Sequence, residues 1–96
     1  MDRQQAIEAL RSEGFIVTQR QWSLGDSICV AALPVPDSDI RAYRVMIFLY
    51  PERGGWQVLN PATVPALDQA FPSLAEAVPF AADLMRQEIE GQQSDG

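Results

Sequence analysis

Hydrophobic and polar positions repeat with two different periods along this chain. Apolar residues recur at helical spacing over residues 2–13, and Gly14 then supplies a left-handed stop, so the pattern predicts a short N-terminal helix. The same spacing returns over residues 74–89, directly after the capping-box sequence Ser-Leu-Ala-Glu at 73–76. A second helix is therefore expected near the C-terminus. Between the two helical stretches the repeat shortens to two residues, which is typical of strands.

Four stretches between the helices read as strands bounded by turn residues: 14–22, 27–33, 41–50 and 56–60. Residues 61–72 contain three prolines and are expected to be mostly irregular. The predicted order is α-β-β-β-β-α, an α+β two-layer sandwich in which both helices flank one face of a four-stranded antiparallel sheet. Residues 1–90 are expected to form a single domain, and residues 91–96 a disordered tail.

The third predicted strand is apolar on both of its faces. Val45, Ile47 and Leu49 alternate with Met46 and Phe48, and helices can cover only one face of a two-layer fold. We expect the odd-numbered side to face the helices, so that the even-numbered side stays open. Aromatic and arginine side chains with few acids are typical of protein-binding surfaces. The candidate partner-binding residues are Trp22, Arg44, Met46, Phe48, Tyr50 and Trp56.

Several occupants of this open face are compatible with the sequence. The sheet can curl and bury the face itself, or residues 61–72 can fold across it. A second copy of the chain can cover it as a homodimer, or another protein can bind there. Arginine next to aromatic residues can also stack single-stranded bases, which gives an alternative function.

The charge distribution disfavours nucleic acid as a partner. The net charge of the 96-residue chain is −6, and residues 61–96 hold six acids against the single base Arg86. This region repels phosphate and attracts basic proteins. No apolar run is long enough to span a membrane, and the N-terminus has no signal-peptide pattern, so a cytoplasmic location is expected. The single cysteine, Cys29, is expected to be a buried thiol.

Catalytic motifs are missing from the sequence. The chain has no histidine, which removes the commonest general base and most zinc sites, and it contains no phosphate-binding glycine loop. We therefore expect neither an enzyme nor a cofactor. Asp37 and Asp39 are weak candidates for a Mg²⁺ or Ca²⁺ site, because such ions prefer oxygen ligands. A small-ligand or metal site near residues 34–39 is thus a second alternative function, and a solvated turn explains the same residues.

From Tyr43 onward, the chain resembles the HicB-type antitoxin domain of bacterial toxin–antitoxin pairs. The resemblance covers residues 43–91 and rests on "VMIFLYPERGG", "WQV", "NPATVP" and "SLAEAV". It implies a non-catalytic domain that docks on a protein. A helix and a hairpin precede the matching part, and Pro72 stands where such domains usually have glycine. We expect no second, DNA-binding domain after Ile89, so operator binding is not carried over.

The sequence as a whole therefore predicts a small cytoplasmic protein-binding module without catalysis. Its action would be self-association, antitoxin-like or immunity-like neutralisation, or service as an accessory subunit.

Overall fold

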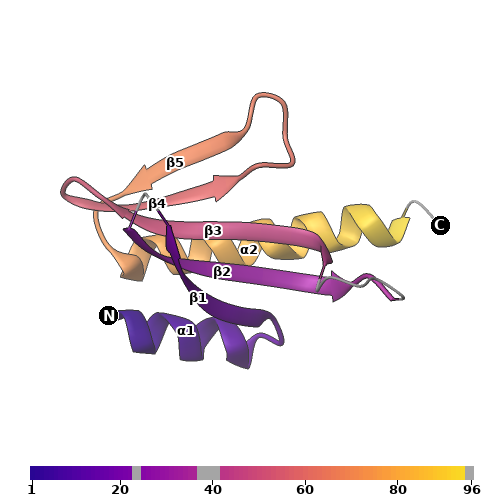
Figure 1. Cartoon of the computed structure of the whole chain (residues 1–96), viewed down its shortest axis with the longest axis horizontal. Coiled ribbons are helices and arrows are strands. Elements are labelled where there is room, and N and C mark those ends of the chain that lie inside the picture. Colours follow the sequence, from indigo (N-terminus) through magenta and orange to yellow (C-terminus); the bar gives the residue numbers. More distant parts are fainter. Residues whose placement is uncertain (23–24, 37–41, 95–96) are drawn as a thin grey trace.

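The computed structural model describes residues 1–22, 25–36 and 42–94, without the side chains at positions 21, 22, 25, 93 and 94. Within this described part of the chain, two helices flank five strands (Figure 1). The elements are α1 (Arg3–Ser12), β1 (Ile16–Trp22), β2 (Gly25–Pro34), β3 (Tyr43–Glu52), β4 (Gly55–Asn60), β5 (Leu67–Phe71) and α2 (Leu74–Ser94). The α+β class is confirmed, with one strand more than the sequence predicted.

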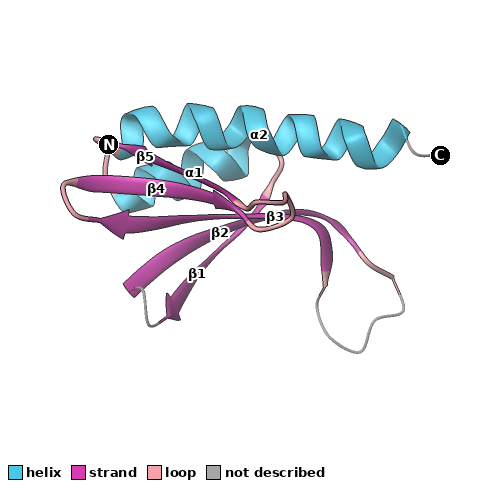
Figure 2. Cartoon of the chain, turned by 90° about the horizontal axis from the view of Figure 1, so that it is seen from above, coloured by secondary structure: helices cyan, strands magenta, loops and turns pink. Residues whose placement is uncertain are grey.

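The sheet is a meander of antiparallel strands in the order β1-β2-β3-β4-β5. Every strand therefore pairs with its neighbours in sequence. One register row crosses the whole sheet and joins Thr18, Cys29, Phe48, Leu59 and Asp68. Both helices lie on the same side of the sheet (Figure 2). We call the uncovered side the outer face.

The fifth strand corrects the expectation for residues 61–72. Five of these residues form β5, which pairs with β4 and extends the sheet at its edge. The segment therefore does not fold across the outer face. Its three prolines had argued against a strand, yet Pro61 and Pro65 lie in the β4–β5 loop and Pro72 follows β5. The strand itself thus contains no proline and can donate its backbone hydrogen bonds.

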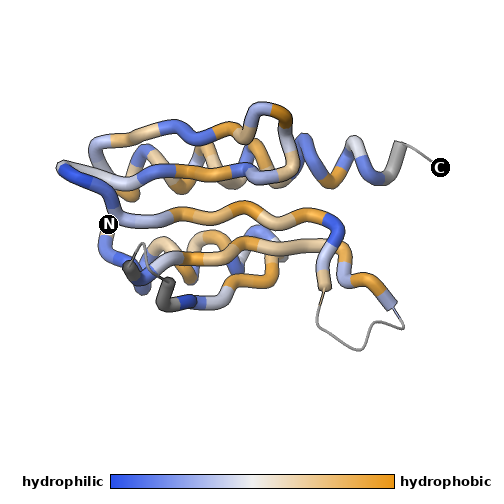
Figure 3. Tube along the Cα trace, turned by 45° about the horizontal axis from the view of Figure 1, so that its top comes forward, coloured by the Kyte–Doolittle hydropathy of each residue, from blue (hydrophilic) through white to orange (hydrophobic). Residues whose placement is uncertain are grey.

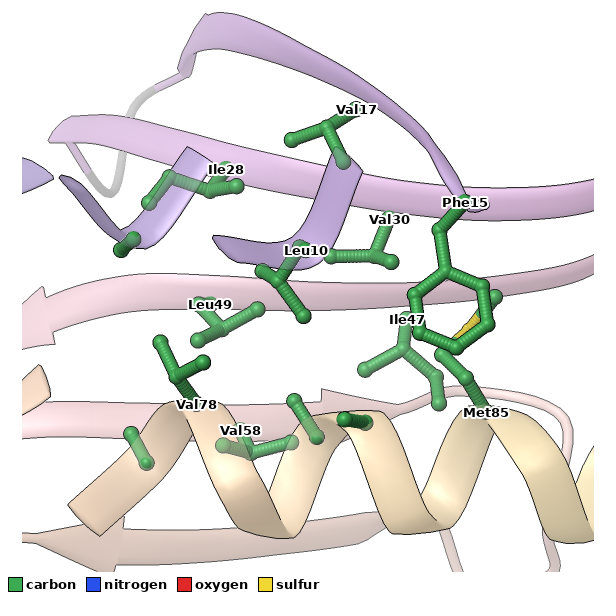
Figure 4. Packing of buried hydrophobic residues seen from close by; sticks show 14 of the residues in the cluster. Leu10, Phe15, Val17, Ile28, Val30, Ile47, Leu49, Val58, Val78 and Met85 are labelled. Atoms are coloured by element: carbon green, nitrogen blue, oxygen red, sulfur yellow. The ribbon is translucent and has the colours of Figure 1, made fainter. Parts of the chain in front are cut away.

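The hydrophobic core lies between the sheet and the helices, and it contains the predicted face of β3. Val45, Ile47 and Leu49 are at most 4% exposed and pack in one cluster with the apolar stripes of both helices. Figure 4 shows Leu10 of α1 and Val78 and Met85 of α2 directed toward these strands. Hydrophobic positions are concentrated along β2 and β3 (Figure 3).

The helix ends follow from local sequence, with one extension. The Asp2 carboxylate accepts the Gln5 amide at 2.8 Å, and the Gln5 side chain accepts the Asp2 amide at 2.9 Å, so a capping box opens α1. Gly14 follows α1 with a φ of 95°, which glycine reaches without strain. Helix α2 begins directly after Ser73, includes Pro79, and continues beyond the tail boundary expected at residue 91.

Candidate functional site

Alternation along the strands determines which side chains reach the outer face. On β3 these are Arg44, Met46, Phe48 and Tyr50, because the residues between them enter the core. Four of the six predicted binding residues therefore lie in one row along the middle strand. Among the described residues, no helix or loop forms a layer over this face (Figure 2).

The middle of the outer face is nevertheless shielded from solvent. Phe48 is 8% exposed and Tyr50 is 7% exposed, while Cys29 and Ala31 on β2 are each 2% exposed. In Figure 2 the end of β1, the start of β2 and the paired end of β2 with the start of β3 lie farther from the helices than the middle of the sheet, so the face is concave over β1 and β2. Twisted antiparallel strands bring side chains on a concave face over one another. Phe48 and Tyr50 are thus the floor of the face, as the curled-sheet alternative anticipated.

The residues around this floor are more accessible. Ile16 on β1 is 38% exposed, Arg44 is exposed, and Met46 and Leu59 are half-buried. A hollow of about 170 Å³ opens over β1 and β2 and is bounded mainly by small or apolar side chains. It is lined by Ile16, Thr18, Gln19, Arg20, Cys29, Ala31 and Tyr43. The sequence had not selected Ile16 or Cys29 as site residues, although the same two-residue alternation places both on this face.

Cys29 lines this hollow as a buried free thiol. Burial raises the pKa of Cys29, and the nearby Arg20 charge and a hydrogen bond with Thr18 oppose this effect only partly. A thiol whose pKa is raised stays protonated at neutral pH and is a poor nucleophile.

Polar contacts cross the outer face on its β4–β5 side. The Tyr50 hydroxyl lies 2.8 and 3.0 Å from the two carboxylate oxygens of Asp68 and also contacts the Gln57 side chain. Burial, followed by the hydrogen bond to Asp68, raises the pKa of Tyr50 to about 12. The phenol is therefore a neutral donor that holds the carboxylate in place.

Charge is unevenly divided across the outer face. Arg20 on β1 and Arg44 on β3 are exposed, whereas Asp68 on β5 is an exposed acid. Glu52, at the end of β3, is a second exposed acid on this alternation, so the division is clearest between the edges: Arg20 lies on the β1 edge strand and Asp68 on the β5 edge strand. A surface with opposite charges at opposite edges can match a copy of itself after a twofold rotation.

Trp56 does not share this face, which corrects its grouping with the other candidates. It pairs with Phe71 and packs against the core cluster on the helix side. The Arg3 guanidinium lies 5.4 Å from the centre of its ring and also forms a 3.1 Å ion pair with Asp26. The β3–β4 turn sets this register, because Glu52 pairs with Gly55 and thereby gives Trp56 the same orientation as the core residue Val58.

The remaining sequence candidates cannot be placed. The Trp22 side chain lies outside the described residues, although its backbone ends β1, and Asp37 and Asp39 lie outside them entirely. Within the described part of the chain, no three histidine, cysteine or acidic residues cluster as metal ligands would. In the same part, no helix combines the length and apolar character needed to cross a membrane.

Comparison of the chain with protein-family models, with curated proteins and with solved structures gave no match.

Proposed function

We propose that this protein is a non-catalytic protein-binding module that acts through the outer face of its sheet. One observation carries the proposal: the outer face combines half-buried apolar side chains, exposed arginines and a shallow hollow, and no second layer covers it within the described residues. Apolar surface of this kind on a small domain is typical of interaction sites. The buried free thiol of Cys29 fits the reducing cytoplasm, which we include in the proposal as its location.

The structure changes which residues should make the contact. Phe48 and Tyr50 are already buried in the single chain, so they shape the surface but offer little area to a partner. Ile16, Met46 and Arg44 are more exposed and surround them. We therefore assign partner contact to these rim residues and a supporting role to the floor.

A second copy of the chain is the partner that the charges favour. A twofold axis that runs parallel to β3, between the outer faces of two copies, places β1 of one copy over β5 of the other. Arg20 then approaches the partner copy's acidic edge, where Asp68 lies, and the apolar rims meet between them. The resemblance to HicB-type antitoxin domains supports a second occupant, a toxin-like protein, on the same surface.

Molar mass measured by light scattering over a wide concentration range tests this proposal. We expect the unaltered chain to dimerise, and Ile16→Glu together with Met46→Glu to produce a folded monomer. Ala75→Glu is the matched control, because it adds a carboxylate at an exposed position on the opposite side of the molecule.

Two results would contradict parts of the proposal. A chain that stays monomeric at every concentration would reject the second copy as the occupant. If the rim variant and the Ala75→Glu control then also retained the same proteins from a host lysate, the outer face itself would be excluded as the binding surface.

A further inference from the structure

The strand at the far edge of the sheet has a free backbone edge. Within the described residues β5 pairs with β4 alone, and its five residues contain no proline. Proteins commonly protect such edges with proline, bulges or a covering element, because an unpaired edge accepts a further strand. β5 has two other common protections, a short length and the charge of Asp68, but no proline or bulge interrupts its edge.

The register shows which backbone groups face outward. A two-residue turn joins β3 to β4 and closes on the pair Glu52 and Gly55, which is the hydrogen-bonded kind of pair. Because backbone groups alternate in direction along a strand, Leu67, Gln69 and Phe71 point theirs toward β4. The N–H and C=O groups of Asp68 and Ala70 consequently point to the open side.

The opposite edge of the sheet is β1, and part of its backbone edge is bonded by a side chain of α1. By the same alternation, Val17 on β1 directs its carbonyl away from β2, and the Arg11 guanidinium of α1 donates to it at 2.9 Å. Helix α1 also lies along β1 (Figure 1). Among the hydrogen bonds of the described residues, no side chain bonds to the backbone groups of Asp68 or Ala70. The edge at β5 is therefore the more accessible one.

A groove runs beside this edge on the helix side. It has a volume of about 470 Å³ and lies between β5 and α2. Leu67, Phe80 and Leu84 supply its apolar part, and Gln69, Asp83 and Gln87 supply its polar part. The ring of Phe80 also packs against Phe71 at 4.9 Å, which fixes the helix beside the strand. A strand added to β5 would direct every second side chain into this groove.

We infer that β5 binds an extended segment of another protein as an additional antiparallel or parallel strand, with apolar residues in the groove and basic residues on the outer side. The site shares Asp68 with the proposed dimer face, but it adds the backbone edge of β5 and the groove on the helix side, which that face does not use. Lysine or arginine residues of the segment would lie beside Asp68, while the alternate apolar residues would contact Leu84 and Phe80.

The charge around β5 selects this occupant over a second copy. Residues 61–92 contain five acids and one arginine: Asp68, Glu76, Asp83, Glu88 and Glu90 against Arg86. Two copies joined edge to edge through β5 would bring these acidic segments together, and like charges at that distance repel. A basic segment gains from the same charges.

The test uses a short blocked peptide of alternating lysine and valine, added to the full chain while amide chemical shifts are followed by NMR. We expect shifts at Asp68, Ala70 and residues 80–87, and roughly tenfold weaker binding of a peptide with glutamate in place of lysine. Ala70→Pro removes an outward N–H and should weaken binding roughly tenfold, whereas the control Ala70→Ser should leave it nearly unchanged.

A second probe keeps the inference testable if Ala70→Pro does not fold. The same lysine–valine peptide is prepared in two forms, one N-methylated at every lysine and one at every valine. The form whose methylated N–H groups face β5 cannot complete the backbone ladder and should bind the unaltered chain roughly tenfold more weakly than the other form. Equal binding of the two methylated forms would overturn strand addition. Shifts confined to the outer face, or concentration-dependent shifts at the groove residues 80–87 without peptide, would overturn the assignment of this occupant.

Discussion

The hydroxyl of Tyr50 on β3 donates a hydrogen bond to the carboxylate of Asp68 on β5, and so links two strands that do not pair with each other. The Gln57 side chain of the intervening β4 contacts the same hydroxyl. The contact fastens the edge strand to the middle of the sheet on the side that no helix covers. The position of β5 therefore depends on a polar contact in addition to its ladder with β4.

This contact predicts an alkaline loss of stability. The folded-state pKa of Tyr50, about 12, lies above the ordinary tyrosine pKa of about 10. The contribution is therefore complete below about pH 10 and is lost as the pH rises toward 12. The free energy of unfolding, measured with urea between these two pH values, should fall by up to about 2 kcal/mol.

Two variants separate this phenol from general alkaline unfolding. Tyr50→Phe should lower stability by about 1 kcal/mol at neutral pH and remove most of the alkaline loss. Asp68→Asn keeps an acceptor but removes the charge, so the tyrosinate absorbance should appear at a lower pH. An unchanged alkaline profile in Tyr50→Phe would show that another group is responsible.

Asn60 should be the most sensitive polar residue of the core side. It is 1% exposed, its amide donates to Glu88 of α2 at 3.1 Å, and its oxygen accepts the Ala62 amide at 3.1 Å. Asn60→Ala leaves the Glu88 carboxylate and the Ala62 amide without this hydrogen-bond partner. The substitution should therefore lower the free energy of unfolding by about 1–3 kcal/mol. Glu88→Gln retains an acceptor oxygen and should have a smaller effect. Equal losses in the two variants would contradict this explanation.

Gly55 allows β5 to approach the β3–β4 turn. A Cβ atom at this position would lie 2.1 Å from the carbonyl oxygen of Phe71, so the backbone of β5 would have to move. Gly55→Ala should therefore destabilise the protein by about 1–3 kcal/mol and perturb the β5 amide shifts. Gly91→Ala is the control, because nothing lies within 4 Å of its Cβ and alanine favours a helix by about 1 kcal/mol. Destabilisation by both would refute the steric argument.

Phe48 and Ile16 should respond differently to truncation although both lie on the outer face. Phe48 is 8% exposed, so Phe48→Ala should lower the free energy of unfolding by about 3 kcal/mol or more. Ile16 is 38% exposed, and Ile16→Ala should cost less than about 1 kcal/mol while weakening self-association. Thermal unfolding and light scattering measure the two effects. The distinction between floor and rim fails if both variants lose the same stability.

Local signals were sufficient for most of the fold. The repeat of two residues along β3 correctly assigned Val45, Ile47 and Leu49 to the core, and the glycine stop at Gly14 ended α1 where predicted. β5 was missed because the prolines around it masked a strand that has only Leu67 and Phe71 as apolar markers. Its identity as a strand comes from pairing with β4, which is a tertiary effect.

The candidate site was harder to predict for related reasons. Whether Phe48 and Tyr50 are exposed depends on the curvature of the sheet, and no single strand contains that information. The side assigned to Trp56 depends on register through the turn at residues 53–54, where one residue of slip exchanges the two faces. The groove beside β5 requires both the missed strand and the placement of α2.

The meander order also determines how the molecule can assemble. All four strand pairings join segments that are consecutive in the chain, so each ladder closes over a short loop, and such local contacts form rapidly. Helix α2 is the exception, since it contacts α1 and β2 from the other end of the sequence. During synthesis, the sheet and α1 emerge before α2, and the apolar side of β3 and β4 then lacks its cover. Packing of α2 onto the sheet is consequently the step that covers the exposed apolar strands and completes the folded domain.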